Sequence, residues 1–141
     1  MRAGVISFVL TLLAAVTAAS AQPAPAALSA WIAEPEAGAT GASAYVELSN
    51  PTMYEVYVVS ATAEAAAATV EFRAGLVPGG APTPVPEFGI PAYGSVAAAA
   101  LSPHLRLVGL TRPLVAGDTV ALVLKTDGGV TLRVSATVRK P

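Results

Sequence analysis

The side chains best suited to chemistry lie in one short segment, Pro103 to Leu110, which contains the only histidine of the chain. Here His104 and Arg106 alternate with Leu105 and Leu107. Such alternation is typical of a β-strand, whose successive side chains point to opposite faces. If the leucines pack inward, His104 and Arg106 both project from the outer face, with their α-carbons roughly 7 Å apart. The imidazole could then ligate a metal ion, and the guanidinium could bind an anion.

A plainer interpretation of each candidate stays open. A lone histidine at a strand edge is more often a hydrogen-bonded surface residue than a ligand, and Met53, in a predicted turn, is more often a gap-filling apolar residue. Glu87 and the other carboxylates are scattered as surface charges usually are. The chain has no cysteine, serine elbow, phosphate loop or dinucleotide-binding fingerprint. We therefore expect that the protein is not an enzyme.

Residues 1–21 have the pattern of a secretory signal peptide. Met1 and Arg2 give the charged start, residues 5–16 form the apolar middle, and Ala19-Ser20-Ala21 is a small-residue cleavage site, so we expect cleavage before Gln22. The apolar run has about a dozen residues, short of the roughly 20 that cross a bilayer. We expect a periplasmic or secreted protein without permanent membrane insertion, and the lack of cysteine argues against a lipid anchor.

The rest of the chain fits one folded domain. Pro23 and Pro25 predict an extended leader over residues 22–27, and residues 28–141 have the size of a single domain. Without Arg2, seven of the eight basic residues remain against nine acidic ones, with no run of like charge. Nucleic-acid binding needs a concentrated basic patch, so we exclude nucleic acid as a partner.

The hydrophobic periodicity predicts an all-β fold of about seven or eight strands. The strongest strand covers residues 130–138, where apolar and polar residues alternate, and Asp127-Gly128-Gly129 predicts a hairpin with residues 119–125. Residues 75–86, rich in proline and glycine, predict a loop, and the alanine-rich residues 61–68 predict one helical turn. The other expected strands are residues 28–34, 43–49, 54–62, 69–73 and 94–101.

Four segments together carry a family signature. They are Ser29-Ala30-Trp31-Ile32, residues 44–50 ending in Asn50, the turn from Ile90 to Val96, and the run from Pro103 to Leu124. This pattern resembles the periplasmic copper(I) chaperones of the PCuAC type. The resemblance implies a single-domain, two-sheet β-sandwich close to a cupredoxin-like Greek-key barrel. As a role it implies copper(I) handling and copper delivery to a respiratory oxidase, with a copper protein or an oxidase-assembly factor as partner.

The resemblance also assigns four ligand positions, of which one keeps its ligand. Residues 70–73 match the strand that ends in the family's first copper-binding histidine, which puts Arg73 at that position. Pro82 stands where the first methionine belongs, and His104-Leu105-Arg106 stands where the family has His-x-Met. A guanidinium stays charged and would repel a bound cation. We therefore expect His104 to be the single inherited ligand and copper(I) not to be bound tightly.

Two functional hypotheses remain. The first is a copper-chaperone homologue whose ligand set is largely lost, and the second is a metal-free binding or interaction module on the same scaffold. In the second case Arg73, His104 and Arg106 could form a patch for a carboxylate or phosphate, because one guanidinium can hold two oxygens. Two independent, solvated arginines are the plainer alternative.

Overall fold

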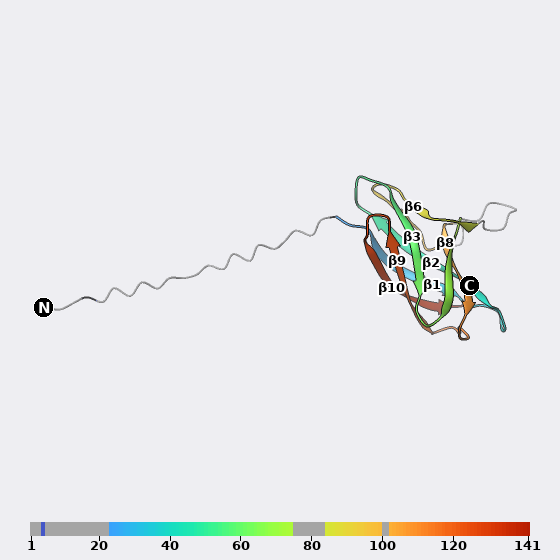
Figure 1. Ribbon diagram of the computed structural model, residues 1–141. Coiled ribbons are helices and arrows are strands. Elements are labelled where there is room, and N and C mark those ends of the chain that lie inside the picture. The colour runs from blue at the N-terminus through green and yellow to red at the C-terminus, as the bar shows by residue number, and fades with distance from the viewer. Residues whose placement is uncertain (1–3, 5–22, 75–83, 100–101) are drawn as a thin grey trace.

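The computed structural model describes residues 4, 23–74, 84–99 and 102–141, and these residues form ten β-strands (Figure 1). Apart from Gly4, the predicted signal peptide lies outside these residues, as does Gln22. In the described part there is no helix, and so none that could cross a membrane. The strands are β1 (Ala26–Ala33), β2 (Gly41–Asn50), β3 (Val56–Ala63), β4 (Ala67–Arg73), β5 (Pro84–Val85), β6 (Phe88–Ile90), β7 (Gly94–Val96), β8 (His104–Leu110), β9 (Thr119–Thr126) and β10 (Thr131–Arg139).

Hydrogen bonds join the strands into one continuous sheet in the order β5-β4-β8-β2-β1-β10-β9-β3-β6, with β7 also paired to β2. All pairs are antiparallel except β1 with β10. The two ends of this order, β5 and β6, are separated in the chain by only Pro86 and Glu87. The sheet therefore curls round into a nearly closed barrel, and the predicted all-β, cupredoxin-like barrel is confirmed.

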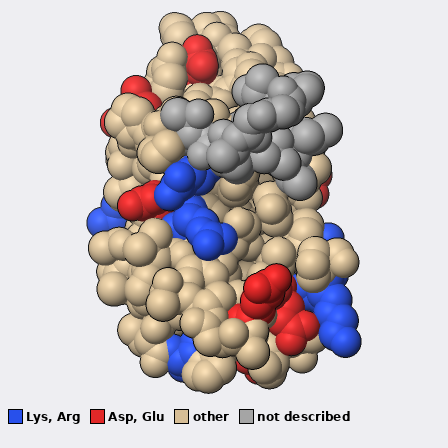
Figure 2. Space-filling model, turned by 90° about the vertical axis from the view of Figure 1, so that its right-hand side faces the viewer, with Lys and Arg blue, Asp and Glu red and all other residues tan. Residues whose placement is uncertain are grey.

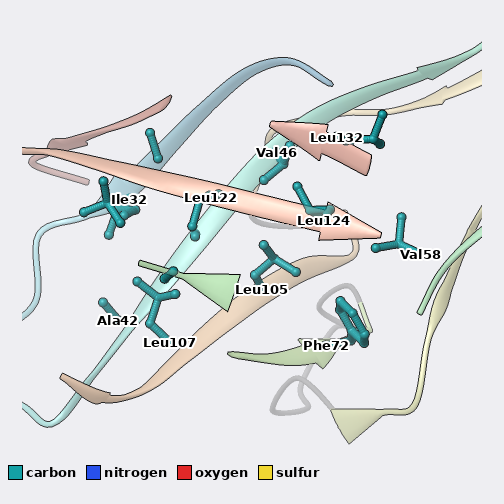
Figure 3. Packing of buried hydrophobic residues seen from close by; sticks show 14 of the residues in the cluster. Ile32, Ala42, Val46, Val58, Phe72, Leu105, Leu107, Leu122, Leu124 and Leu132 are labelled. Atoms are coloured by element: carbon teal, nitrogen blue, oxygen red, sulfur yellow. The ribbon is translucent and has the colours of Figure 1, made fainter. Parts of the chain in front are cut away.

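The core fills the inside of this barrel. In β2, buried residues alternate strictly with half-exposed ones along the whole strand, as a period of two requires. Figure 3 shows the inward side chains of several strands meeting between the layers. Each fully buried aliphatic side chain contributes roughly 1.5–3 kcal/mol of hydrophobic stabilisation. Residues with no exposed surface include Ile32, Ala44, Leu48, Val58, Ile90, Leu105, Leu107, Leu124 and Ala136.

The predicted hairpin near the C-terminus is confirmed. β9 and β10 pair in antiparallel register from Thr119 with Thr137 to Lys125 with Thr131. The turn between them includes Gly129, whose φ of 82° lies in the left-handed region that favours glycine. Leu132, Ala136 and Val138 face the core, as the alternation predicts.

Three expectations about local structure are wrong. The alanine-rich residues 61–68 form no helical turn: β3 runs to Ala63, a tight turn follows, and β4 begins at Ala67. Pairing of these strands with β9 and β8 outweighs the local helix preference of alanine. The strand expected over residues 94–101 ends at Val96, and Pro84–Val85, expected in a loop, form the edge strand β5. The rest of that expected loop, residues 75–83, lies outside the described residues.

Candidate functional site

The residues singled out by the sequence come together because β8 lies between β4 and β2. His104 is paired with Arg73 of β4, while Arg106 is paired with Glu71 on one side and Ser43 on the other. Directly opposite residues of neighbouring strands share a face of the sheet. Leu105 and Leu107 are fully buried in the core, as predicted, so all of these polar side chains lie on the outer face.

His104 is nevertheless shielded from solvent, with 4% of its surface exposed. Its Nδ1 lies 3.1 Å from the carbonyl oxygen of Ser102, and its ring centroid is 5.1 Å from that of Tyr45. A carbonyl only accepts, so Nδ1 is the nitrogen that carries hydrogen, and in a neutral ring Nε2 carries the lone pair. The simpler expectation of a surface histidine is wrong, because the side chain is buried and the Tyr45 ring lies beside it.

An aromatic row continues from His104 across the sheet. Tyr45 and Trp31 are paired between β2 and β1, with ring centroids 4.6 Å apart. The Trp31 indole N–H donates to the carbonyl oxygen of Ala98 at 2.9 Å, and the guanidinium carbon of Arg139 lies 4.1 Å from the centre of the Trp31 ring. Trp31 and Tyr45 belong to the family signature, but their placement in a row with His104 depends on strand register, which cannot be read from one sequence.

Each arginine of the site already has a polar partner. The Arg73 guanidinium forms an ion pair with Glu71 at 2.6 Å, and Arg106 donates to the Ser43 hydroxyl at 3.2 Å. Among the described residues, Arg73 Nε is a buried nitrogen without a hydrogen-bond partner. Figure 2 shows this side of the molecule, where basic side chains lie beside an acidic one next to the grey residues. Glu71 is the component that the sequence analysis missed, so the patch combines two cations with a carboxylate.

A shallow hollow of about 280 Å³ adjoins the outer end of Arg106. Its lining includes Glu34 and Glu36 from the loop after β1, together with Ser43. Arg106 therefore shares this hollow with two glutamates, and its partner on β4 is a third, Glu71. This surrounding reduces the positive potential that two arginines alone would produce.

Of the ligand positions that the resemblance assigns, His104 is the one within the described residues whose side chain can ligate a metal ion. The described part of the chain holds no group of three histidine, cysteine, aspartate or glutamate side chains that could hold a metal ion. Arginine offers no lone pair to a metal. Met53 lies beyond the end of β2, and the five steps from Tyr45 to Asn50 alone span roughly 16 Å, so it is remote from His104. Pro82 lies outside the described residues.

Comparison with known proteins identifies the family. The model of the LpqE-like family, which is named for a lipoprotein, matches residues 26–138. The solution structure of copper(I)-bound DR1885 from Deinococcus radiodurans is 32% identical, with a TM-score of 0.69, and the match covers 86% of this chain and 83% of that one. The apo form of the same protein is 31% identical, with a TM-score of 0.58, over 100% of this chain and 95% of that one.

A more distant likeness supports the fold. The copper-bound PCuAC domain of PmoF2 is 18% identical, with a TM-score of 0.69, and the match covers 82% of this chain and 92% of that domain. No curated protein matches the chain. The family match over most of the sequence and the likeness to DR1885 agree with the barrel described above. The chain therefore belongs to the LpqE-like family of PCuAC-type domains.

Proposed function

We propose that this protein is an extracytoplasmic PCuAC-type copper-chaperone homologue whose copper(I) site has been reduced to His104, and that it acts as a metal-free binding module. Descent from copper-binding domains is supported by the likeness to DR1885, whose solution structure is copper(I)-bound. The observation that carries the proposal is the pairing of Arg73 with His104, and the position of Arg106 two residues further along β8. The signal-peptide pattern supports export to the periplasm or beyond.

The charge of the arginines decides against tight copper binding. A second positive charge about 4 Å from a bound ion costs on the order of 4 kcal/mol at an effective dielectric near 20, before discounting for solvent. One imidazole cannot offset this cost. Copper delivery to a respiratory oxidase, which the resemblance implies, would need a tighter site, and we propose that this chain does not perform it. A metal-free module could still bind a copper protein or an oxidase-assembly factor, because docking uses the surface of the scaffold.

A copper(I) titration against a competing chelator tests the proposal on the predicted mature chain, residues 22–141. We expect the natural sequence to bind no tighter than micromolar. The double variant Arg73→His plus Arg106→Met returns two soft donors to the positions beside His104 and should tighten binding at least about tenfold. Adding His104→Ala should remove that gain.

A matched control exchanges arginines elsewhere on the barrel. Arg112→His plus Arg133→Met makes the same chemical changes away from His104, and should leave copper binding as weak as in the natural sequence. A stoichiometric submicromolar site in the natural protein, abolished by His104→Ala alone, would contradict the proposal and restore the copper-chaperone function.

A second candidate function, anion binding by Arg73, His104 and Arg106, is supported by their placement on one face. Glu71 competes with any anion, since it already occupies the Arg73 guanidinium. We expect phosphate to raise the melting temperature relative to chloride at equal ionic strength, and Glu71→Gln to enlarge that rise. Arg73→Ala plus Arg106→Ala should abolish it. No phosphate-dependent shift in either the natural protein or Glu71→Gln would end the idea.

A further inference from the structure

Two loops are joined into one rigid unit beyond the end of β2. The Tyr93 amide donates to the Thr52 carbonyl at 3.0 Å. The Asn50 side chain, 1% exposed, donates from Nδ2 to the carbonyls of Tyr54, Ile90 and Pro91 at 2.8, 3.0 and 3.1 Å. Its Oδ1 accepts from the Thr52 amide and hydroxyl at 3.0 and 2.6 Å. One buried side chain therefore ties residues 51–54 to residues 90–93.

This unit presents three large side chains to solvent, here called the aromatic tip: Met53, Tyr54 and Tyr93. They are 61%, 72% and 72% exposed. Within the described part of the chain they make up half of the large exposed apolar residues, the others being Leu28, Val59 and Val115. Tyrosine and methionine are enriched where proteins bind other proteins. Because the loops are already fixed by Asn50, the tip would lose little conformational entropy on binding.

Tyr93 occupies a position whose backbone conformation favours glycine. Its φ is +52°, in the left-handed region that bulky residues rarely adopt. Backbone strain of this kind persists when the surrounding structure enforces it, and it is concentrated at functional sites. Here the Thr52 carbonyl and the turn from Pro91 to Gly94 enforce it. The cost of placing a tyrosine here points to a use for its exposed ring.

The rim beside the tip is acidic. Glu55 follows Tyr54 directly and hydrogen-bonds the Tyr57 hydroxyl, which raises the pKa of Tyr57 above 10.0, and the charges of Glu87 and Asp127 act in the same direction. Residues 23–72 and 84–99, which include both loops, β3 and β6, contain no lysine or arginine. A partner that covers the tip would therefore meet a negative potential at its edge.

We propose that the aromatic tip is a docking surface for a basic, apolar segment of a partner protein. Lysine and arginine stack on tyrosine faces, and their alkyl stems cover apolar surface while their charged ends reach acidic groups. The exposed rings of Tyr54 and Tyr93 supply the faces, and Glu55, Glu87 and Asp127 supply the complementary charge. This surface is separate from the His104 site, because β2 carries it roughly 16 Å from Tyr45.

The test uses a fluorescein-labelled peptide of alternating lysine and leucine, with an alternating glutamate and leucine peptide for comparison. We expect fluorescence anisotropy to show saturable binding of the lysine peptide alone, weakened severalfold as ionic strength rises. Tyr54→Ser plus Tyr93→Gly should weaken it at least about tenfold. Glycine suits the φ of residue 93, so this variant should keep its fold.

The matched control is Val115→Ser, which removes an exposed apolar residue from the loop between β8 and β9. It should leave peptide affinity unchanged. A second variant, Glu55→Gln plus Glu87→Gln, retains the rings and should lower affinity by reducing the rim charge. The proposal is overturned if the tip variant binds the lysine peptide as the natural protein does, or if both peptides bind equally. It is also overturned if the tip instead mediates self-association, or if it binds phosphatidylcholine vesicles in preference to the peptide.

Discussion

At the scale of single residues, the setting of His104 would suit a metal ligand. Metal-bound histidines commonly donate their second ring N–H to a carbonyl, which fixes the tautomer and the ring orientation. His104 makes this contact with Ser102. The same contact, together with the Tyr45 ring, also holds a histidine that binds nothing. These contacts of the imidazole therefore need no metal ion, and in the function that we propose the two arginines keep a cation from approaching it.

The raised pKa of Tyr57 leads to a prediction about stability at alkaline pH. The Glu55 hydrogen bond is the largest cause of its raised pKa. A raised pKa means that the folded state holds the phenolic proton more tightly than the unfolded state. This contribution to stability is complete below about pH 10 and is lost as pH rises through the raised pKa.

Glu55→Gln should therefore lower the Tyr57 pKa toward 10.0 and flatten the loss of stability above that pH. An NMR titration of the Tyr57 ring measures the first effect, and urea unfolding at several alkaline pH values measures the second. Glu64→Gln, a carboxylate that does not act on Tyr57, serves as the control. An unchanged Tyr57 pKa in Glu55→Gln would show that the hydrogen bond is not its cause.

At the scale of elements, the sequence predicted those strands whose signals are local. Period two over residues 130–138 and the Asp127-Gly128-Gly129 turn identified β9, β10 and their pairing. Leu105 and Leu107 oriented β8 correctly. Residues 61–68 were misassigned because alanine favours helix locally, whereas the register with β8 and β9, which lie far away in the chain, determines their structure.

The candidate site was predictable only in part for the same reason. The sequence put His104 and Arg106 on one face, because both belong to one strand. It could not pair Glu71 with Arg106 or place Tyr45 beside His104, because these contacts depend on the register between strands. The register between strands that lie far apart in the chain cannot be read from one sequence, although it decides which side chains meet. The partners of Arg73 and Arg106 therefore came from the structure.

The turn between β9 and β10 predicts different effects for two adjacent glycines. Gly129 has a φ of +82°, so Gly129→Ala should destabilise the fold by about 1–2 kcal/mol. A methyl group at Gly128 would meet only the Thr126 hydroxyl, at 4.0 Å, and its φ is not in the left-handed region. Gly128→Ala should be neutral or stabilising by up to about 1 kcal/mol, since it restricts the unfolded chain. Urea unfolding of both variants measures the difference, and equal losses would contradict it.

At the scale of the whole molecule, β10 is the strand that unites the barrel. It lies between β1 and β9 in the sheet. The strands β9, β3 and β6 are therefore connected to the other strands of the sheet only through β10. Its buried side chains, Leu132, Ala136 and Val138, belong to the common core. The two halves of the sheet therefore depend on the last strand of the chain.

Deletion of residues 131–141 should consequently abolish folding rather than trim one edge of the sheet. We expect a truncated chain to lose the dispersed amide NMR spectrum and the cooperative urea transition of the full protein. Removal of residues 23–24, which are exposed and belong to no strand, is the control and should leave both intact. A truncated chain with a cooperative transition would show that the β1–β2–β8–β4 half is stable alone.

The parallel pairing of β1 with β10 also affects when the protein can fold. Ala30 of β1 is paired with Ala136 of β10, which lies more than a hundred positions later in the chain. At about 5–20 residues per second, a ribosome needs on the order of 5–20 s to make the intervening chain. During that time the first strand has no neighbour on one side, and such long-range pairing is slow to form. The barrel can therefore close only after β10 has been synthesised, and such a delay would suit the export that we propose.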